Sequence, residues 1–121
     1  MDNSAGVSLY TYVLNNQIKL KFTNIGDRDI DLYTPCLTNT LVYVSEDGID
    51  IKPKILLRRN CDAKIISLKL GESKEFVYPY KINELYNFED KREYLLRIEY
   101  LTFNKGKVVS KIISNNFSFT K

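Results

Sequence analysis

Histidine is absent from this chain of 121 residues, and its absence excludes more chemistry than any other feature of the composition. Without an imidazole there is no Ser-His-Asp or Cys-His catalytic group, no HExxH zinc site and no histidine-based metal site. The five glycines are scattered singly, so they form neither a GxxxxGK[ST] phosphate loop nor a GxGxxG motif. We therefore predict that the protein is not an enzyme and needs no cofactor.

Cysteine is scarce, since only Cys36 and Cys61 are present, and their spacing is far too wide for a CxxC metal or redox motif. Cys36 follows one predicted strand, a hairpin then turns at Asp47-Gly48, and Cys61 follows the returning strand. Both cysteines are therefore expected at the same end of the molecule. We predict a disulfide between them if the compartment is oxidising, with two buried thiols as the alternative.

Long hydrophobic runs are also missing. No apolar stretch approaches the roughly 18 residues that a membrane-spanning helix needs. The N-terminal segment "MDNSAGVSLY" lacks the basic start and apolar core of a signal peptide, yet it resembles the beginning of a mature exported protein. We expect a periplasmic or secreted protein, with the cytoplasm as the alternative.

The net charge is only +3, and lysines alternate with acidic residues without forming a block. Such a distribution creates no strong field for nucleic acid or anionic lipid. The nine tyrosines and six phenylalanines could in principle stack on bases, but most alternate with polar residues, as core side chains of strands do. We predict no nucleic-acid partner.

Alternation of apolar and polar residues runs through most of the chain. In "QIKLKFTN", Ile18, Leu20 and Phe22 alternate with polar residues, which is the period of a strand with one solvated face. The other runs of this kind are "RDIDLYT", "TLVYVSE", "IDIKPKILL", "KIISLKL", "KEFVYPY", "EYLLRIEYLTF", "KVVSKIIS" and "NNFSFTK". We predict about seven to nine strands.

The connecting segments fit this interpretation. Short polar turns are predicted at Asn15-Asn16, at residues 24–27, at Asp47-Gly48 and at residues 104–106. In "YKINELYNFEDK" the spacing of Ile82, Leu85 and Tyr86 predicts one short helical turn near residues 82–88. The sequence therefore predicts a single domain over residues 1–121, all-β, folded as an Ig-like antiparallel β-sandwich.

The stretch "ISLKLGESKEFVYPY" could suggest a catalytic loop, because Gly-Glu-Ser separates two apolar runs. A nucleophile elbow requires GxSxG between a strand and a helix, and this segment has neither. We interpret residues 71–73 as a turn. Leu68 and Leu70 are expected on the buried face of the strand before it, and Phe76, Tyr78 and Tyr80 on that of the strand after it.

Alternating aspartates in "GDRDIDLYT" resemble the beginning of a calcium-binding loop. Asp27, Asp29 and Asp31 would be the first ligands, but Leu32 and Thr38 stand where such a loop needs Gly and Glu. The pairs Glu93 with Glu99 and Asp47 with Asp50 are the candidates for a glycosidase. We interpret all these carboxylates as surface charges of strands and turns.

Several landmarks follow one another along the chain: Asn24, Thr34-Pro35, Asp47-Gly48, Arg58-Arg59, residues 68–73, Leu85-Tyr86 and residues 94–100. In this order they resemble the N-terminal β-sandwich domain that precedes the protease domain in bacterial deuterolysin-like zinc metalloendopeptidases. The resemblance extends over about residues 15 to 100, and its motifs are mostly turns and core positions. It implies a sandwich fold without the catalytic domain, and no zinc-protease residue can be assigned to this chain.

We expect a non-enzymatic protein-binding module, such as an inhibitor or immunity-type protein acting on a secreted enzyme or toxin. Loops are where rigid β scaffolds usually bind, and a disulfide would preorganise two of them. The alternative is a structural or assembly subunit that forms oligomers through sheet edges. The predicted partner-binding residues are Thr34, Pro35, Leu37, Thr38, Arg58, Arg59, Asn60 and Asp62.

Overall fold

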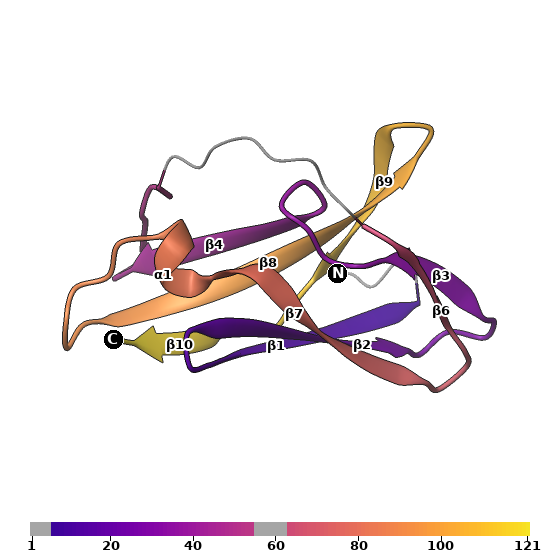
Figure 1. Ribbon diagram of the computed structural model, residues 1–121, viewed down its shortest axis with the longest axis horizontal. Coiled ribbons are helices and arrows are strands. Elements are labelled where there is room, and N and C mark those ends of the chain that lie inside the picture. Colours follow the sequence, from indigo (N-terminus) through magenta and orange to yellow (C-terminus); the bar gives the residue numbers. More distant parts are fainter. Residues whose placement is uncertain (1–5, 55–62) are drawn as a thin grey trace.

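The computed structural model describes residues 6–54 and 63–121, which contain ten strands and one short helix (Figure 1). Every paired strand is antiparallel to its neighbour. The elements are β1 (Val7–Leu14), β2 (Gln17–Asn24), β3 (Ile30–Tyr33), β4 (Thr40–Glu46), β5 (Ile49–Asp50), β6 (Ile65–Leu68), β7 (Ser73–Lys81), α1 (Ile82–Leu85), β8 (Glu93–Asn104), β9 (Lys107–Ile113) and β10 (Phe117–Thr120).

Two sheets form the layers of the sandwich, and a two-stranded ribbon closes one end. One sheet has the order β1-β2-β7, and the other has the order β10-β8-β4-β5, with β9 also paired to β8. β3 and β6 form the ribbon. In Figure 1, β4 and β8 lie above β1, β2 and β7, and the hairpin of β8 and β9 rises beyond both layers. The predicted all-β sandwich is confirmed.

The core lies between the two sheets and is built by period-2 alternation. In β8, the side chains of Tyr94, Leu96, Ile98 and Tyr100 point inward and are almost fully buried. From the opposite sheet, Phe22 meets Tyr100 edge to face, with ring centroids 4.9 Å apart. Such aromatic pairs add to the stabilisation that comes from area burial alone.

Individual polar side chains join the separate sheets. Tyr100 donates its hydroxyl to the Tyr33 carbonyl at 2.6 Å and accepts the Tyr33 amide at 3.0 Å, which ties β3 to β8. Asn115, between β9 and β10, accepts the Thr11 amide at 2.8 Å and donates to the Thr11 carbonyl at 3.2 Å. The Asn115 amide therefore occupies the outer edge of β1 as a neighbouring strand would.

The predicted helical turn and three of the four predicted polar turns are confirmed, whereas residues 24–27 are the end of β2 and the beginning of an irregular connection to β3. Asn15, Asn16, Asp47 and Lys105 all have positive φ, and in each case they belong to a two-residue hairpin turn. These residues fit type I′ turns, whose twist matches that of the flanking strands. α1 begins where expected, and Ile82, Leu85 and Tyr86 are all buried. The Ile82 amide donates to the Asn16 carbonyl, which fixes α1 against the β1–β2 turn.

Three expectations were wrong. No strand was expected at β1, because Tyr10 and Tyr12 on its outer face hide the alternation of its buried residues. Within the described part of the predicted strand "IDIKPKILL", only β5 is a strand, and residues 51–54 are irregular, with Pro53 lacking an amide donor; residues 55–57 lie outside the described residues. Leu70 was expected to be buried but is 54% exposed. β6 already ends at Leu68, and the chain turns there toward β7 in the β1-β2-β7 sheet.

Among the described helices, none is long and apolar enough to cross a membrane.

Candidate functional site

The predicted partner-binding loop at residues 34–39 connects β3 to β4 and is held by Asn39. The Asn39 side chain accepts the Cys36 amide at 2.8 Å and the Thr40 hydroxyl at 2.7 Å. It also donates to the Thr34 carbonyl at 3.1 Å. Asn39 itself is buried, so its amide organises the loop from inside.

Most of this loop faces the interior. Pro35 and Cys36 are buried, Thr34 and Leu37 are half-buried, and Thr38 is exposed. Thr34 is further tied to residue 64, because the Lys64 amide donates to its hydroxyl at 2.9 Å. A partner could therefore contact Thr38 and the exposed part of the Leu37 side chain without a change in the conformation of this loop.

The second half of the predicted site lies outside the described residues. This applies to Arg58, Arg59, Asn60 and Asp62, and also to Cys61. Their role in binding and the Cys36–Cys61 disulfide therefore stay predictions.

A groove begins beside Leu37 and runs along the free edge of β4 toward α1. Its volume is about 390 Å³, which falls within the range typical of ligand and peptide sites. Residues 40–44 of β4 form one wall, and residues 50–54 cover it from the side. The apolar and aromatic lining comes from Leu37, Ile51, Pro53, Tyr78, Leu85 and Tyr86.

Hydroxyl groups occupy the β4 edge at the floor of the groove. Tyr78 donates to the Thr40 carbonyl at 3.0 Å, and Tyr86 donates to the Val42 carbonyl at 2.8 Å. Farther along, the Ile51 amide donates to the Val44 carbonyl at 3.0 Å. Because these donors already fill the positions of a neighbouring strand, the groove is shaped to receive side chains and not an added strand.

The rim of the groove is polar. Lys54 donates its backbone amide to the Leu85 carbonyl at 2.7 Å and its Nζ to the Asn83 carbonyl at 2.6 Å. Asp50 is exposed and pairs with Ser45 across the β4–β5 turn. The site thus combines an apolar floor with one charge of each sign at its margin, as the core and rim of a protein interface do.

Burial changes the acidity of the tyrosines that hold the β4 edge and the ribbon. Burial raises the pKa of the Tyr78 and Tyr86 hydroxyls above the usual value for a phenol. It also raises the pKa of Tyr100 to about 12, although the hydrogen bond with Tyr33 acts in the opposite direction. All three are therefore neutral donors at any physiological pH.

We expect stability to fall in alkali between about pH 10 and pH 12. The unfolded chain loses its phenol protons near pH 10, whereas Tyr100 in the folded chain holds its proton up to about pH 12. The folded state therefore binds more protons in this window, and the free energy of unfolding decreases as pH rises. Urea unfolding across this range measures the effect, and Tyr100→Phe should flatten the slope relative to wild type. An unchanged slope in that variant would contradict the assignment.

The alternative carboxylate sites are mostly engaged in structural contacts. Asp31 accepts the Ser67 hydroxyl at 2.8 Å, and Asp29 accepts the Leu70 amide at 3.2 Å. Glu93 and Glu99 lie six residues apart on β8, which is about 20 Å along an extended strand and too far for a glycosidase pair. Glu93 is exposed, but the interpretation of Glu99 as a surface charge was wrong, because Glu99 is only 8% exposed and is paired with Arg97 and Lys111. In residues 6–54 and 63–121, no three Cys, Asp or Glu side chains gather into a metal site.

Sequence reasoning found Leu37 but missed the rest of the groove. Its walls come from four separate segments, and each shows only the ordinary pattern of a strand or helical turn. Tyr78 and Tyr86 were expected to be structural, which is correct, but their position over the β4 edge depends on how α1 and β7 pack. No local signal could have shown this.

Comparison with known proteins gives no guide to function. No model of a protein family matches the chain, and the search of curated proteins finds no significant match either. The resemblance to the sandwich domain of deuterolysin-like proteases therefore remains an expectation.

Proposed function

We propose that this protein is a non-enzymatic binding module that takes up apolar side chains of another protein in the β4 groove. The proposal rests on the groove itself. This groove has an apolar lining and begins beside the half-buried Leu37 of the predicted binding loop. Desolvated pockets of this kind, lined by tyrosine and aliphatic residues, are where binding energy concentrates at protein interfaces.

Rigidity supports the same proposal. The floor is fixed by Tyr78 and Tyr86 through their hydrogen bonds to β4, and the side wall by Lys54 through its bonds to residues 83 and 85. A preformed site loses little conformational entropy when a partner binds. An exported enzyme or toxin is the partner class to test first, as the inhibitor or immunity-type role expected from the sequence requires.

The test compares two neighbouring isoleucines. Ile51 lines the groove and is partly buried, whereas Ile49 is 70% exposed in β5 and lies outside the groove. We expect Ile51→Lys to weaken partner binding by about 10- to 100-fold, since it places a charge against the apolar lining. Ile49→Lys introduces the same charge nearby and should leave binding unchanged.

The measurement is affinity capture from an extract of the producing cells in non-reducing buffer, with wild type and both variants immobilised. A chain retained by wild type and Ile49→Lys but lost by Ile51→Lys supports the proposal, and its enzymatic or toxic activity is then assayed with and without the module. Equal retention by all three proteins would exclude the groove as the binding site.

Assembly through sheet edges, the alternative expected from the sequence, is less favoured at the edges of β1, β4 and β7. Asn115 occupies the outer edge of β1, and tyrosine hydroxyls occupy that of β4. β7 contains Pro79, which lacks an amide donor, and charged residues such as Lys74 and Glu75. Proline and charge are the usual means by which edge strands avoid pairing.

A further inference from the structure

The central strand β8 is apolar on both faces, although only one face lies in the core. Tyr94, Leu96, Ile98 and Tyr100 point inward, whereas Leu95, Leu101 and Phe103 lie on the opposite side. Leu95 is 47% exposed and Phe103 is 42% exposed. A strand with apolar residues on both sides is typical of sheets covered on both faces. We call the side of β8 with Leu95, Arg97, Glu99, Leu101 and Phe103 the outer face.

One end of the outer face is a basic hairpin. β9 pairs with β8 as far as Asn104, but β4 pairs with β8 only up to Tyr100, so the tip extends beyond the sheet. Lys105, Lys107 and Lys111 are all exposed there. The chain has no Asp or Glu from residue 100 to its end. Lys111 is paired with Glu99 of the same chain at 3.7 Å, so the uncompensated positive charge of the hairpin comes from Lys105 and Lys107.

The other end is an acidic hollow of about 710 Å³. Its floor includes Leu95 with its cross-strand neighbours Ser45 and Ser118, and Glu46, Asp47 and Glu93 line it. Arg92 also lines the hollow, but it is paired with Glu46 at 3.3 Å and with Glu89 at 2.6 Å. Acidic residues therefore outnumber basic ones in the lining.

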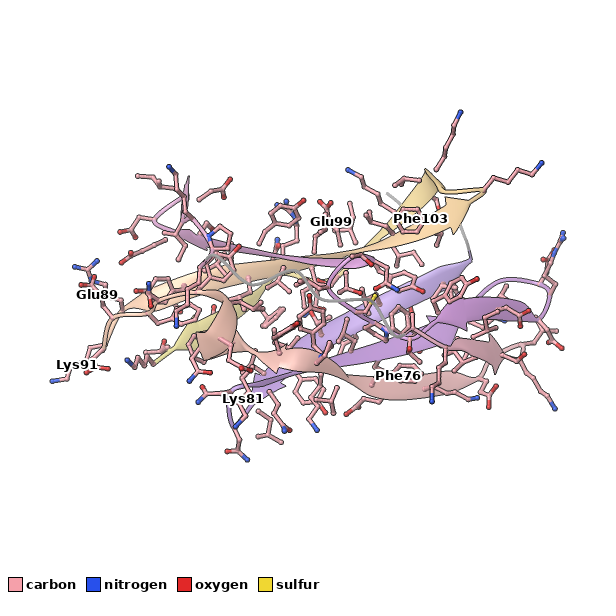
Figure 2. All side chains as sticks on the ribbon, turned by 45° about the horizontal axis from the view of Figure 1, so that its top comes forward. Phe76, Lys81, Glu89, Lys91, Glu99 and Phe103 are labelled. Carbon is pink, nitrogen blue, oxygen red and sulfur yellow. The ribbon has the colours of Figure 1, made fainter. Side chains whose placement is uncertain are left out.

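Glu99 lies between these two ends. Figure 2 shows it on the side of β8 turned away from the β1-β2-β7 sheet, with Phe103 toward one end of the molecule and Glu89 and Lys91 at the other. The residue is 8% exposed, and its carboxylate is paired with Arg97 at 3.4 Å and Lys111 at 3.7 Å. Among the described residues, its Oε1 is the buried side-chain oxygen that has no hydrogen-bond donor.

Arg97 is held in place by a second contact. Its guanidinium lies over the Tyr43 ring, 4.7 Å from the centroid. Stacking on an aromatic face fixes the guanidinium and leaves its remaining N–H groups free to bind a partner's acceptor. Arginine and tyrosine are also the residues most enriched among the dominant contacts of protein interfaces.

We propose that the outer face binds the outer face of a second copy of this chain, with the two β8 strands antiparallel about a two-fold axis near Glu99. In that arrangement the basic hairpin of each copy enters the acidic hollow of the other, and the exposed leucines and Phe103 are buried between them. The contact is self-complementary, as a two-fold interface must be, because one copy supplies both the projecting and the receiving element.

The dimensions and charges agree with this arrangement. Leu95 and Phe103 are eight residues apart, or about 26 Å along the strand, and Glu99 is at the midpoint. The two-fold axis therefore places Phe103 of one copy opposite Leu95 of the other, which brings each basic hairpin to the acidic hollow. The two Glu99 side chains then lie opposite each other, and each is paired with Arg97 and Lys111 of its own copy.

Nucleic acid and lipid fit the outer face less well. The acids of the hollow, Glu46, Asp47 and Glu93, would repel the phosphates of nucleic acid and of anionic lipid headgroups. A second copy supplies both acids for the exposed lysines of the hairpin and lysines for the acids of the hollow. This inference is independent of the proposed groove function, although Leu41 and Tyr43 of β4 adjoin both surfaces.

Sedimentation velocity from micromolar to millimolar concentrations tests the proposal. The wild-type chain should form dimers, and the hairpin variant Lys105→Glu/Lys107→Glu should raise the dimer dissociation constant by more than about 100-fold, since each contact occurs twice. The variant Asp47→Lys/Glu93→Lys, which reverses two charges in the hollow, should raise the dimer dissociation constant by a similar factor. Neither substitution strains the turn, because Asp47-Gly48 and Lys105-Gly106 share the same backbone φ values within about 1°.

The decisive step is to mix the two variants. Each repels itself, but together the acidic hairpin meets the basic hollow and the basic hairpin meets the acidic one. The mixture should dimerise as the wild type does. Lys19→Glu/Lys21→Glu in β2 makes the same charge change on the other sheet and should leave dimerisation unaltered. A monomeric wild type at every concentration, or a mixture that stays monomeric while wild type dimerises, would overturn the proposal.

Discussion

Replacing Phe22 with alanine is expected to lower the free energy of unfolding by about 3–5 kcal/mol. Phe22 is fully buried in β2, and its ring lies 4.9 Å from that of Tyr100 and 6.0 Å from that of Phe76. The substitution removes the aromatic group that joins the β1-β2-β7 sheet to β8 and leaves a cavity between the layers. Urea unfolding followed by circular dichroism measures the change.

Tyr10→Ala is the matched control for this experiment. Tyr10 lies on the outer face of the same sheet, is 55% exposed and contacts only the Tyr12 ring among the described aromatic pairs. Its truncation should cost less than about 1 kcal/mol. Equal losses for Tyr10 and Phe22 would show that the core does not lie where the structure places it.

Asn24→Ala is expected to lower the free energy of unfolding by about 2–4 kcal/mol. Asn24 is 1% exposed, and its Nδ2 donates to the carbonyls of Arg28 and Leu68 at 2.8 and 2.9 Å. Its Oδ1 accepts the Gly26 amide at 3.0 Å. Alanine leaves three backbone groups without this partner at the point where β2, β6 and the loop before β3 meet.

Two further variants separate the hydrogen bonds from the loss of volume. Asn24→Asp keeps the acceptor for Gly26 but places a carboxylate against two carbonyl oxygens, so it should destabilise at least as much as alanine. Asn116→Ala changes an exposed asparagine and should have an effect below about 0.5 kcal/mol. A stable Asn24→Asp protein would show that the donors to Arg28 and Leu68 contribute little.

The two proposed surfaces have different consequences for a partner complex. The groove lies at the β4 edge, and the outer face is centred on β8, with Leu41 and Tyr43 between them. A dimer formed through the outer face would leave both copies with a groove, so one dimer could present two binding sites. Bivalent presentation raises the effective affinity for a partner that has two matching segments.

The fold class and most of the turns could be predicted from the amino-acid sequence alone. Alternation of apolar and polar residues requires a strand with one covered face, and the residue types at Asn15-Asn16 and Asp47-Gly48 tolerate the positive φ of a tight hairpin. The spacing of Ile82, Leu85 and Tyr86 was enough to locate α1. These signals are local, because they depend on residues only a few positions apart.

The surfaces that the strands present, in contrast, depend on tertiary packing. That Tyr78 and Tyr86 close the β4 edge depends on how α1 packs against a strand about 40 residues earlier in the chain. The burial of Glu99 between Arg97 and Lys111 depends likewise on the register of β8 with β9. Groove, hairpin and hollow arise from contacts between distant segments, and the pattern within each segment contains no information about its neighbour.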